Sequence, residues 1–180
     1  TKPYGFQAFY PGPGLGGHCI PLDPYYLSWK AREYGFHTSM IESSMMINDK
    51  MPEYCVDRAA KILNKVKKAM NGSKVLVLGV AQDIDEYRES PALKVIDVLE
   101  REGAEVTFFD PWVKEYKHNG QTRQSIPALT EEVLKEADLV MITTAHTNID
   151  YDMVQKNAAL IFDTKNAMKN IANRENIEVL

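Results

Sequence analysis

The sequence has little excess charge of either sign: 21 lysines and arginines stand against 25 aspartates and glutamates, for a net charge of −4. Without a basic surplus there is no electrostatic footprint for nucleic acid, and an anionic ligand would have to rely on local donors. No apolar run approaches the ~20 residues of a membrane span, and no signal peptide is visible. The composition, 44% hydrophobic and 26% charged, is ordinary for a soluble globular protein.

Cysteine is scarce, with Cys19 and Cys55 the two in the chain. Cys55 falls in a helical pattern and is expected in the core. A disulfide would disable Cys19, so a reducing cytoplasm is the expected setting. His37, His118 and His146 have no metal-ligand spacing with cysteine or with one another, which predicts that there is no metal site.

The glycine fingerprint of dinucleotide-binding domains is missing too. That fingerprint is G-x-G-x-x-G after a strand and at the start of a helix. The run Gly14-Leu15-Gly16 follows a proline-rich loop instead, and the first strand-to-helix turn, after residues 74–79, lacks the glycine triplet. We therefore expect no dinucleotide as the main ligand of this chain.

The most informative stretch that is present runs from Pro11 to Pro24, where Cys19 directly follows a turn with four glycines in the six positions 12–17. Glycine leaves little side-chain bulk, so a ligand could approach the backbone closely. A thiol at the end of such a turn is suited to act as a nucleophile, and Asp23, four residues later, could orient a water or hold a proton. The alternative is a structural turn with a buried cysteine, because free cysteine is among the most buried residue types.

The string GPGLGGHCIPLDP, residues 12–24, resembles the active-site signature of the UDP-glucose/GDP-mannose dehydrogenase family. With His18 before the cysteine and Leu22 after it, the string is more similar to the branch that acts on UDP-N-acetylhexosamines. Enzymes for UDP-glucose usually carry lysine at the position of Leu22. Two further stretches, RESP at 88–91 and FDTKN at 162–166, match family landmarks in the same order. The resemblance covers essentially the whole chain.

The resemblance implies the C-terminal part of a NAD-dependent UDP-N-acetylhexosamine 6-dehydrogenase, in which a first Rossmann-like domain, absent here, binds NAD. Cys19 would attack the C6 aldehyde, and a thiohemiacetal and a thioester would lead to the uronic acid. Asp23 would assist proton transfer or position the hydrolytic water. A homodimer or higher homo-oligomer serving polysaccharide biosynthesis is expected, with this chain inactive alone. The alternative function is a non-enzymatic nucleotide-sugar-binding or dimerisation module.

The resemblance also assigns binding residues. Those expected to contact the UDP-sugar are Phe9, Tyr10, Gly14, Gly16, Gly17 and Lys165. Lys165 stands where relatives often carry arginine, so it would meet a phosphate as a point charge without the guanidinium fork. Arg88 would face the NAD pyrophosphate, the alternative being a surface salt bridge with Glu86 or Glu89. An aromatic residue and a lysine that follow the 79–81 turn in the family are missing here: either the protein lacks these contacts or the sequence omits them.

The pattern of residues also predicts how the chain is organised. A loop over residues 1–24 is followed by helices over 25–35 and about 39–70, with a kink or a new helix start near Pro52. We place a domain boundary in the basic stretch 65–73, which divides the end of a central helical domain with the active-site cysteine loop (1–72) from a UDP-sugar-binding domain (73–180).

Beyond this boundary, buried strands alternate with helices. The strands are expected at 74–79, 106–109, 139–144 and 159–162, the helices after Ser90, from about Thr130 and from Tyr151, and a loop at 112–127. The sequence thus predicts an α/β fold: a Rossmann-like parallel sheet with flanking helices, preceded by an active-site loop and a long linker helix. A ligand is expected beyond the carboxyl ends of the strands.

Overall fold

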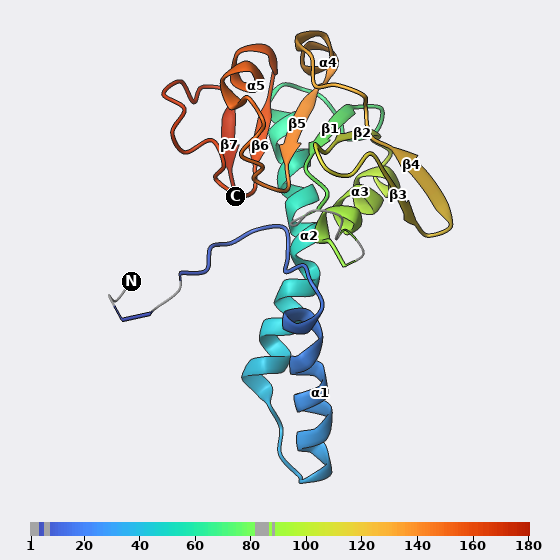
Figure 1. Cartoon of the computed structure of the whole chain (residues 1–180), viewed down its shortest axis with the longest axis vertical. Coiled ribbons are helices and arrows are strands. Elements are labelled where there is room, and N and C mark those ends of the chain that lie inside the picture. Colours follow the sequence, from blue (N-terminus) through green and yellow to red (C-terminus); the bar gives the residue numbers. More distant parts are fainter. Residues whose placement is uncertain (1–3, 6–7, 82–86, 88) are drawn as a thin grey trace.

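The computed structural model describes residues 4–5, 8–81, 87 and 89–180, and it combines a parallel sheet with a pair of helices that extends from it (Figure 1). The sheet has the strand order β2-β1-β5-β6-β7, and every neighbouring pair is parallel. The strands are β1 (Lys74–Leu78), β2 (Glu105–Phe109), β5 (Leu139–Ile142), β6 (Ile161–Asp163) and β7 (Ile177–Val179). The predicted parallel α/β fold and its four strands are confirmed. The short edge strand β7 was not predicted, because its three partly exposed residues give no apolar run.

Alternate residues of the central strands enter two separate cores, as a sheet covered on both faces requires. In β1, Val75 and Val77 belong to one core, and Leu76 and Leu78 belong to the other. This explains the continuous apolar runs, since strands buried on both faces show no polar alternation.

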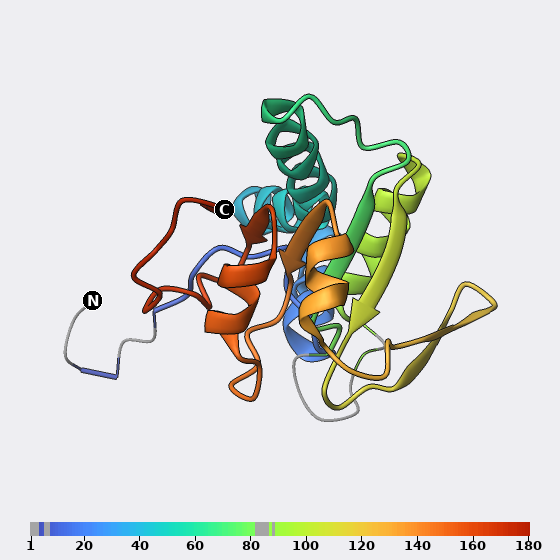
Figure 2. The same cartoon turned by 90° about the horizontal axis from the view of Figure 1, so that it is seen from above.

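Helices cover each face of the sheet (Figure 2). One face packs against α3 (Pro91–Arg101) and the second half of α2 (Ser39–Lys65), and the other packs against α4 (Glu131–Glu136) and α5 (Tyr151–Asn157). The predicted start of α3 is confirmed: Ser90 Oγ accepts a hydrogen bond from the backbone N–H of Ala92 at 3.3 Å, and Pro91 occupies the first turn.

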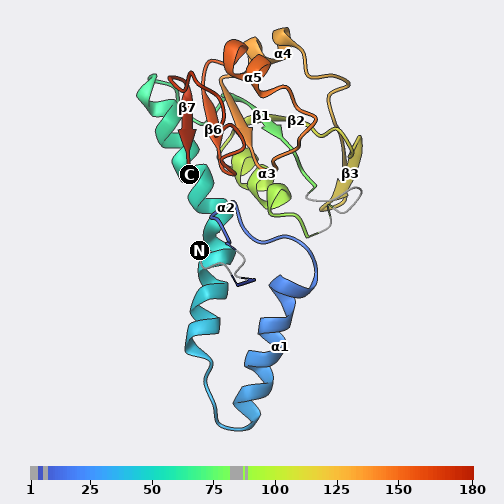
Figure 3. The ribbon, with the colours of Figure 1, turned by 60° about the vertical axis from the view of Figure 1, so that its left-hand side comes forward.

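The helix α1 (Cys19–Glu33) and the first half of α2 form an antiparallel pair below the sheet (Figure 3). Contrary to the prediction, α1 begins at Cys19 rather than 25, so the cysteine lies in a helix and not in a loop. Pro21 is tolerated because backbone N–H groups of the first turn have no partner inside a helix anyway, and the helix continues through Pro24. The helix α2 likewise continues through Pro52 without a new start and ends at Lys65 rather than near 70.

The segment 112–127 is not the predicted loop, because it contains a hairpin of β3 (Glu115–His118) and β4 (Gln121–Gln124). Asn119 and Gly120 form its two-residue turn, with φ of 49° and 76°, which is the turn chemistry that a two-residue hairpin favours. The strands are polar and short, so the apolar pattern did not reveal them. Tyr116 alone is fully buried in the hairpin, with its ring centroid 4.9 Å from that of Phe108.

The two halves of α2 have different surroundings. From Pro52 onward its inward side joins the core of the sheet, with Cys55 and Ala59 at 0% exposure, which confirms Cys55 as a core residue. The first half faces α1 and keeps large apolar side chains at the surface, among them Met40, Met46 and Ile47. None of the described helices is long and apolar enough to cross a membrane.

Candidate active site

Cys19 and Asp23 lie one helical turn apart at the beginning of α1, and both side chains are exposed. Residues four apart share one face of a helix. Both line a cavity of about 690 Å³ between α1 and α2, which we call the thiol cavity. Its other described lining residues are Leu15, Ile20, Pro21, Pro24, Tyr25, Leu27, Met40, Ile41, Ser44, Met45, Asn48 and Asp49. The volume is within the ~300–1,000 Å³ typical of small-molecule sites.

The glycine turn before Cys19 crosses a narrow space between α2 and α3. Gly14 has φ of +133°, and an added Cβ would lie 3.0 Å from Pro91 Cβ, so a larger residue would be crowded there. The next residue, Leu15, donates its backbone N–H to Asn48 Oδ1 at 2.8 Å. Gly16 and Gly17 complete the turn, and an added Cβ at Gly17 would meet open space.

A second cavity, of about 350 Å³, lies at the carboxyl end of β6, and we call it the lysine cavity. Its described lining residues are Tyr10, Pro11, Thr164, Lys165, Asn166, Lys169, Val179 and Leu180. Sequence reasoning missed Lys169, although a second lysine four residues after Lys165 was the available signal. Two ammonium groups beside an aromatic ring suit an anion such as a phosphate.

The carboxylate of Asp163 shapes the loop that carries Lys165. It accepts hydrogen bonds from the backbone N–H groups of Lys165 at 3.1 Å, Ala167 at 3.0 Å and Met168 at 2.8 Å. The glycine turn reaches this loop as well, since an added Cβ at Gly12 would lie 3.0 Å from Lys165 Nζ. The segment from Tyr10 to Cys19 therefore borders both cavities.

Four of the predicted substrate-binding residues are not among the described lining residues of either cavity: Phe9, Gly14, Gly16 and Gly17. Phe9 is 76% exposed, and the three glycines lie in the turn that leads to Cys19. Arg88 lies outside the described residues, as do residues 82–86. Their predicted roles stay predictions.

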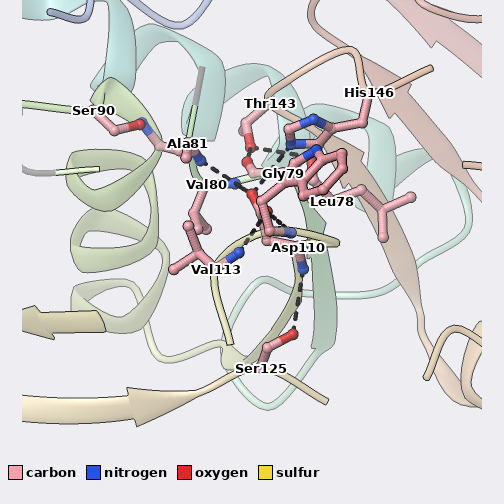
Figure 4. A network of polar contacts seen from close by, with 12 residues as sticks. Leu78, Gly79, Val80, Ala81, Ser90, Asp110, Val113, Ser125, Thr143 and His146 are labelled. Carbon is pink, nitrogen blue, oxygen red and sulfur yellow. Dashed lines mark hydrogen bonds and ion pairs between the residues drawn. The ribbon is translucent and has the colours of Figure 1, made fainter. Parts of the chain in front are cut away.

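A buried aspartate organises the carboxyl ends of β1 and β2 (Figure 4). Asp110, whose side chain is 0% exposed, accepts hydrogen bonds from four backbone N–H groups and lies 3.2 Å from His146 Nε2. The four donors are Val80 at 2.7 Å, Ala81 at 3.1 Å, Trp112 at 2.8 Å and Val113 at 3.0 Å. Burial alone would raise the pKa of Asp110, but the bonds from His146 and the backbone outweigh it and lower the pKa to about 2. The sequence signal was an aspartate directly after a strand.

The backbone at the start of the turn after β1 is closely packed. Gly79 has φ of +84°, and an added Cβ would lie 2.6 Å from Thr144 Cβ and 3.1 Å from His146 Cδ2, so a larger residue would be crowded there. In the described part of the chain, no group of three or more histidine, cysteine, aspartate or glutamate residues clusters closely enough to hold a metal ion.

Comparison with known proteins identifies relatives over the whole chain. The UDP-binding domain of the UDP-glucose/GDP-mannose dehydrogenase family matches residues 76–170, and the central domain of the same family matches residues 1–50. The UDP-N-acetyl-D-mannosamine dehydrogenase of Methanocaldococcus jannaschii is 32% identical over 175 residues, which cover 92% of this chain and 36% of that protein. The UDP-N-acetyl-D-glucosamine 6-dehydrogenase of Pseudomonas aeruginosa is 34% identical over 112 residues, or 61% of this chain and 26% of that protein.

The fold has solved counterparts. The structure of a UDP-D-ManNAc dehydrogenase from Pyrococcus horikoshii matches with a TM-score of 0.79 and 27% identity over 97% of this chain and 40% of that chain. That of the UDP-N-acetyl-mannosamine dehydrogenase Cap5O from Staphylococcus aureus matches with a TM-score of 0.65 and 30% identity over 97% of this chain and 38% of that chain. The chain thus spans between 26% and 40% of the length of these relatives.

Proposed function

This chain belongs to the UDP-glucose/GDP-mannose dehydrogenase family, and from that premise we propose that it is the C-terminal part of a NAD-dependent UDP-N-acetylhexosamine 6-dehydrogenase. The observation that carries the proposal is the arrangement of Cys19 and Asp23 on one face of α1, in the same cavity. The glycine turn leads from this thiol to Lys165. Oxidation of a nucleotide sugar by this route needs a nucleophile beside the sugar and positive charges beside the diphosphate.

Cys19 is the proposed nucleophile. Its Sγ bonds to the C6 aldehyde carbon while the thiol proton moves to the carbonyl oxygen, which gives a thiohemiacetal. Loss of the C6 hydride and the hydroxyl proton leaves a thioester. Water then attacks the carbonyl carbon, the S–C bond breaks, and the uronic acid and the thiol are released. The oxidation of the C6 hydroxyl to the aldehyde, which comes first, and the oxidation of the thiohemiacetal both require NAD as the hydride acceptor. We propose that another domain of the full-length enzyme supplies the NAD site, because the first strand-to-helix turn of this chain lacks the glycine triplet of dinucleotide-binding domains.

Asp23 is the proposed proton carrier. It lies one turn beyond Cys19, so its carboxylate can accept a hydrogen bond from the water that attacks the thioester, provided that the substrate fills the cavity. Exposure of both side chains leaves them open to a substrate.

The lysine cavity is the proposed diphosphate site. Lys165 and Lys169 supply two positive charges at the carboxyl end of β6, where ligands of open parallel sheets bind, and the ring of Tyr10 offers a flat apolar surface. We also propose that residues 1–72 belong to the central domain of the enzyme and that residues 73–180 form its UDP-sugar-binding domain. The enzyme is proposed to form a homo-oligomer, because large apolar side chains such as Trp29 are exposed on the helical pair.

Two experiments test the proposal. In the full-length enzyme, Cys19→Ala should abolish uronic acid formation. Cys55→Ala, which replaces the other cysteine in the core, is the control and should retain it. Normal turnover by Cys19→Ala would refute the assignment of Cys19 as the nucleophile. Calorimetric titration of this chain with UDP-N-acetylglucosamine, UDP-glucose and NAD should show binding of the acetamido sugar nucleotide and none of NAD.

The same titration tests the lysines. A hydrogen bond to a charged group contributes about 1.5 kcal/mol or more, so Lys165→Gln and Lys169→Gln should each weaken binding about tenfold. Lys156→Gln, which removes an exposed charge from α5, should leave binding unchanged. Equal affinities for all three variants would place the diphosphate elsewhere.

A further inference from the structure

Two neighbouring residues of α2 hold the chain on both sides of Cys19. Asn48 Oδ1 accepts the backbone N–H of Leu15 at 2.8 Å, four residues before the cysteine. Asp49 Oδ2 accepts a hydrogen bond from the hydroxyl of Tyr25, six residues after it. All four residues line the thiol cavity together with Cys19. The nucleophile is thus bracketed by contacts to one turn of another helix.

The contact before Cys19 matters more than the one after it. Tyr25 lies inside α1, which also contacts α2 further along, where Glu42 accepts hydrogen bonds from Ser28 at 2.6 Å and from Arg32 at 3.0 Å. The glycine turn has no such regular structure. Glycine allows more backbone conformations than any other residue, so a specific bond is needed to fix one of them.

Asn48 also forms part of the wall against which the turn packs. An added Cβ at Gly14 would lie 3.8 Å from Asn48 Oδ1 and 3.7 Å from Asn48 O, with Pro91 on the other side. The turn is therefore held between α2 and the first turn of α3, and its direction into α1 depends on the amide oxygen of Asn48.

We propose that Asn48 is a positioning residue that sets where Cys19 Sγ lies relative to the reacting carbon, through its hydrogen bond to the backbone of Leu15. The inference rests on the proposed role of Cys19. Asn48 is not among the lining residues of the lysine cavity, the proposed diphosphate site, so loss of the bond should lower kcat far more than nucleotide affinity. A displacement of about 1 Å can lower a rate about 10²-fold.

The test compares Asn48→Leu with Asn48→Asp in the full-length enzyme. Leucine has a similar size but no acceptor, whereas aspartate keeps an oxygen at the same place. We expect Asn48→Leu to lower kcat about 10²-fold with the dissociation constant of UDP-N-acetylglucosamine unchanged within about threefold, and Asn48→Asp to restore kcat to within about fivefold of the native enzyme. Asn64→Leu, at an exposed position of the same helix, is the matched control and should change neither quantity.

Three results would overturn the inference: native kcat in Asn48→Leu, equal losses in the leucine and aspartate variants, or a loss of nucleotide affinity in place of kcat. If Asn48→Leu does not fold, amide hydrogen exchange of the unmodified chain decides. The Leu15 amide should then exchange at least tenfold more slowly than the Gly17 amide after correction for intrinsic rates, and equal rates would refute the bond. Activity in Cys19→Ala would instead refute the proposed function, and the hydrogen bond between Asn48 and Leu15 would then have a structural role alone.

Discussion

Replacement of Gly79 by alanine should destabilise the sheet strongly, because two costs add at this position. The backbone has φ of +84°, where an L-residue costs roughly 1–2 kcal/mol. The new methyl would also lie 2.6 Å from Thr144 Cβ and 2.9 Å from Thr144 O, and overpacking of this kind costs about 1–3 kcal/mol. The sum is about 2–5 kcal/mol of unfolding free energy, or about 10 °C in Tm for a chain of this size.

Gly120 provides the matched control. Its φ of +76° carries the same backbone cost, but nothing lies within 4 Å of an added Cβ. Gly120→Ala should therefore lower Tm by about 2–8 °C, for the backbone cost of about 1–2 kcal/mol alone. Thermal unfolding followed by circular dichroism measures both variants under the same conditions. If the two variants lose equal stability, the packing of Thr144 against Gly79 adds no second cost, and the reasoning from overpacking is wrong.

Three other predictions follow from burial. The pKa of Asp110 is lowered from 3.8 to about 2, so the stability that its carboxylate contributes is present above about pH 4 and is lost as the pH falls to about 2. In urea unfolding, the free energy of unfolding of the native chain should therefore fall by about 2 kcal/mol more over this pH range than that of Asp110→Asn. Burial raises the pKa of the Cys55 thiol to about 12, so iodoacetamide at pH 8 should label the exposed Cys19 alone, and rapid labelling of both in native protein would contradict the fold. The Tyr151 hydroxyl is buried, and its contact with the backbone of His146 falls short of regular hydrogen-bond geometry; Tyr151→Phe should therefore raise Tm by about 2–4 °C, and a lower Tm would mean that this contact is a stabilising hydrogen bond.

The sequence allowed the parallel sheet to be predicted because its strands are buried on both faces. Runs such as 74–78 are apolar at every position after the first, and no amphipathic helix shows that pattern. Signals at helix ends were equally informative: Ser90 followed by Pro91 gave the start of α3. These features could be predicted because each depends on residues that are close together in the sequence.

The hairpin of β3 and β4 could not be predicted in the same way. Its strands are polar, and what holds it is distant in sequence: Tyr116 packs on Phe108, and Arg123 pairs with Glu100 of α3. The start of α1 was misplaced because prolines at 21 and 24 normally argue against a helix. In the structure, the backbone N–H of Leu15 donates to Asn48 of α2 and the hydroxyl of Tyr25 donates to Asp49 of α2. These two hydrogen bonds hold the segment against α2, and no pattern of residue types predicts them.

The candidate site, too, could be predicted from the sequence only in part. The motif identified Cys19, Asp23 and Lys165 as residue types in a familiar order, but not what connects them. The structure adds that connection: the glycine turn contacts Lys165 at Gly12, Pro91 at Gly14 and Asn48 through Leu15. Gly14 is where close approach requires glycine, because its φ is +133° and an added Cβ would lie 3.0 Å from Pro91 Cβ. At Gly17 the requirement is conformational, since φ is +85° and nothing lies within 4 Å of an added Cβ. At Gly12 the neighbour is the flexible end of the Lys165 side chain, so Gly14 is the glycine that lets the turn pass between α2 and α3.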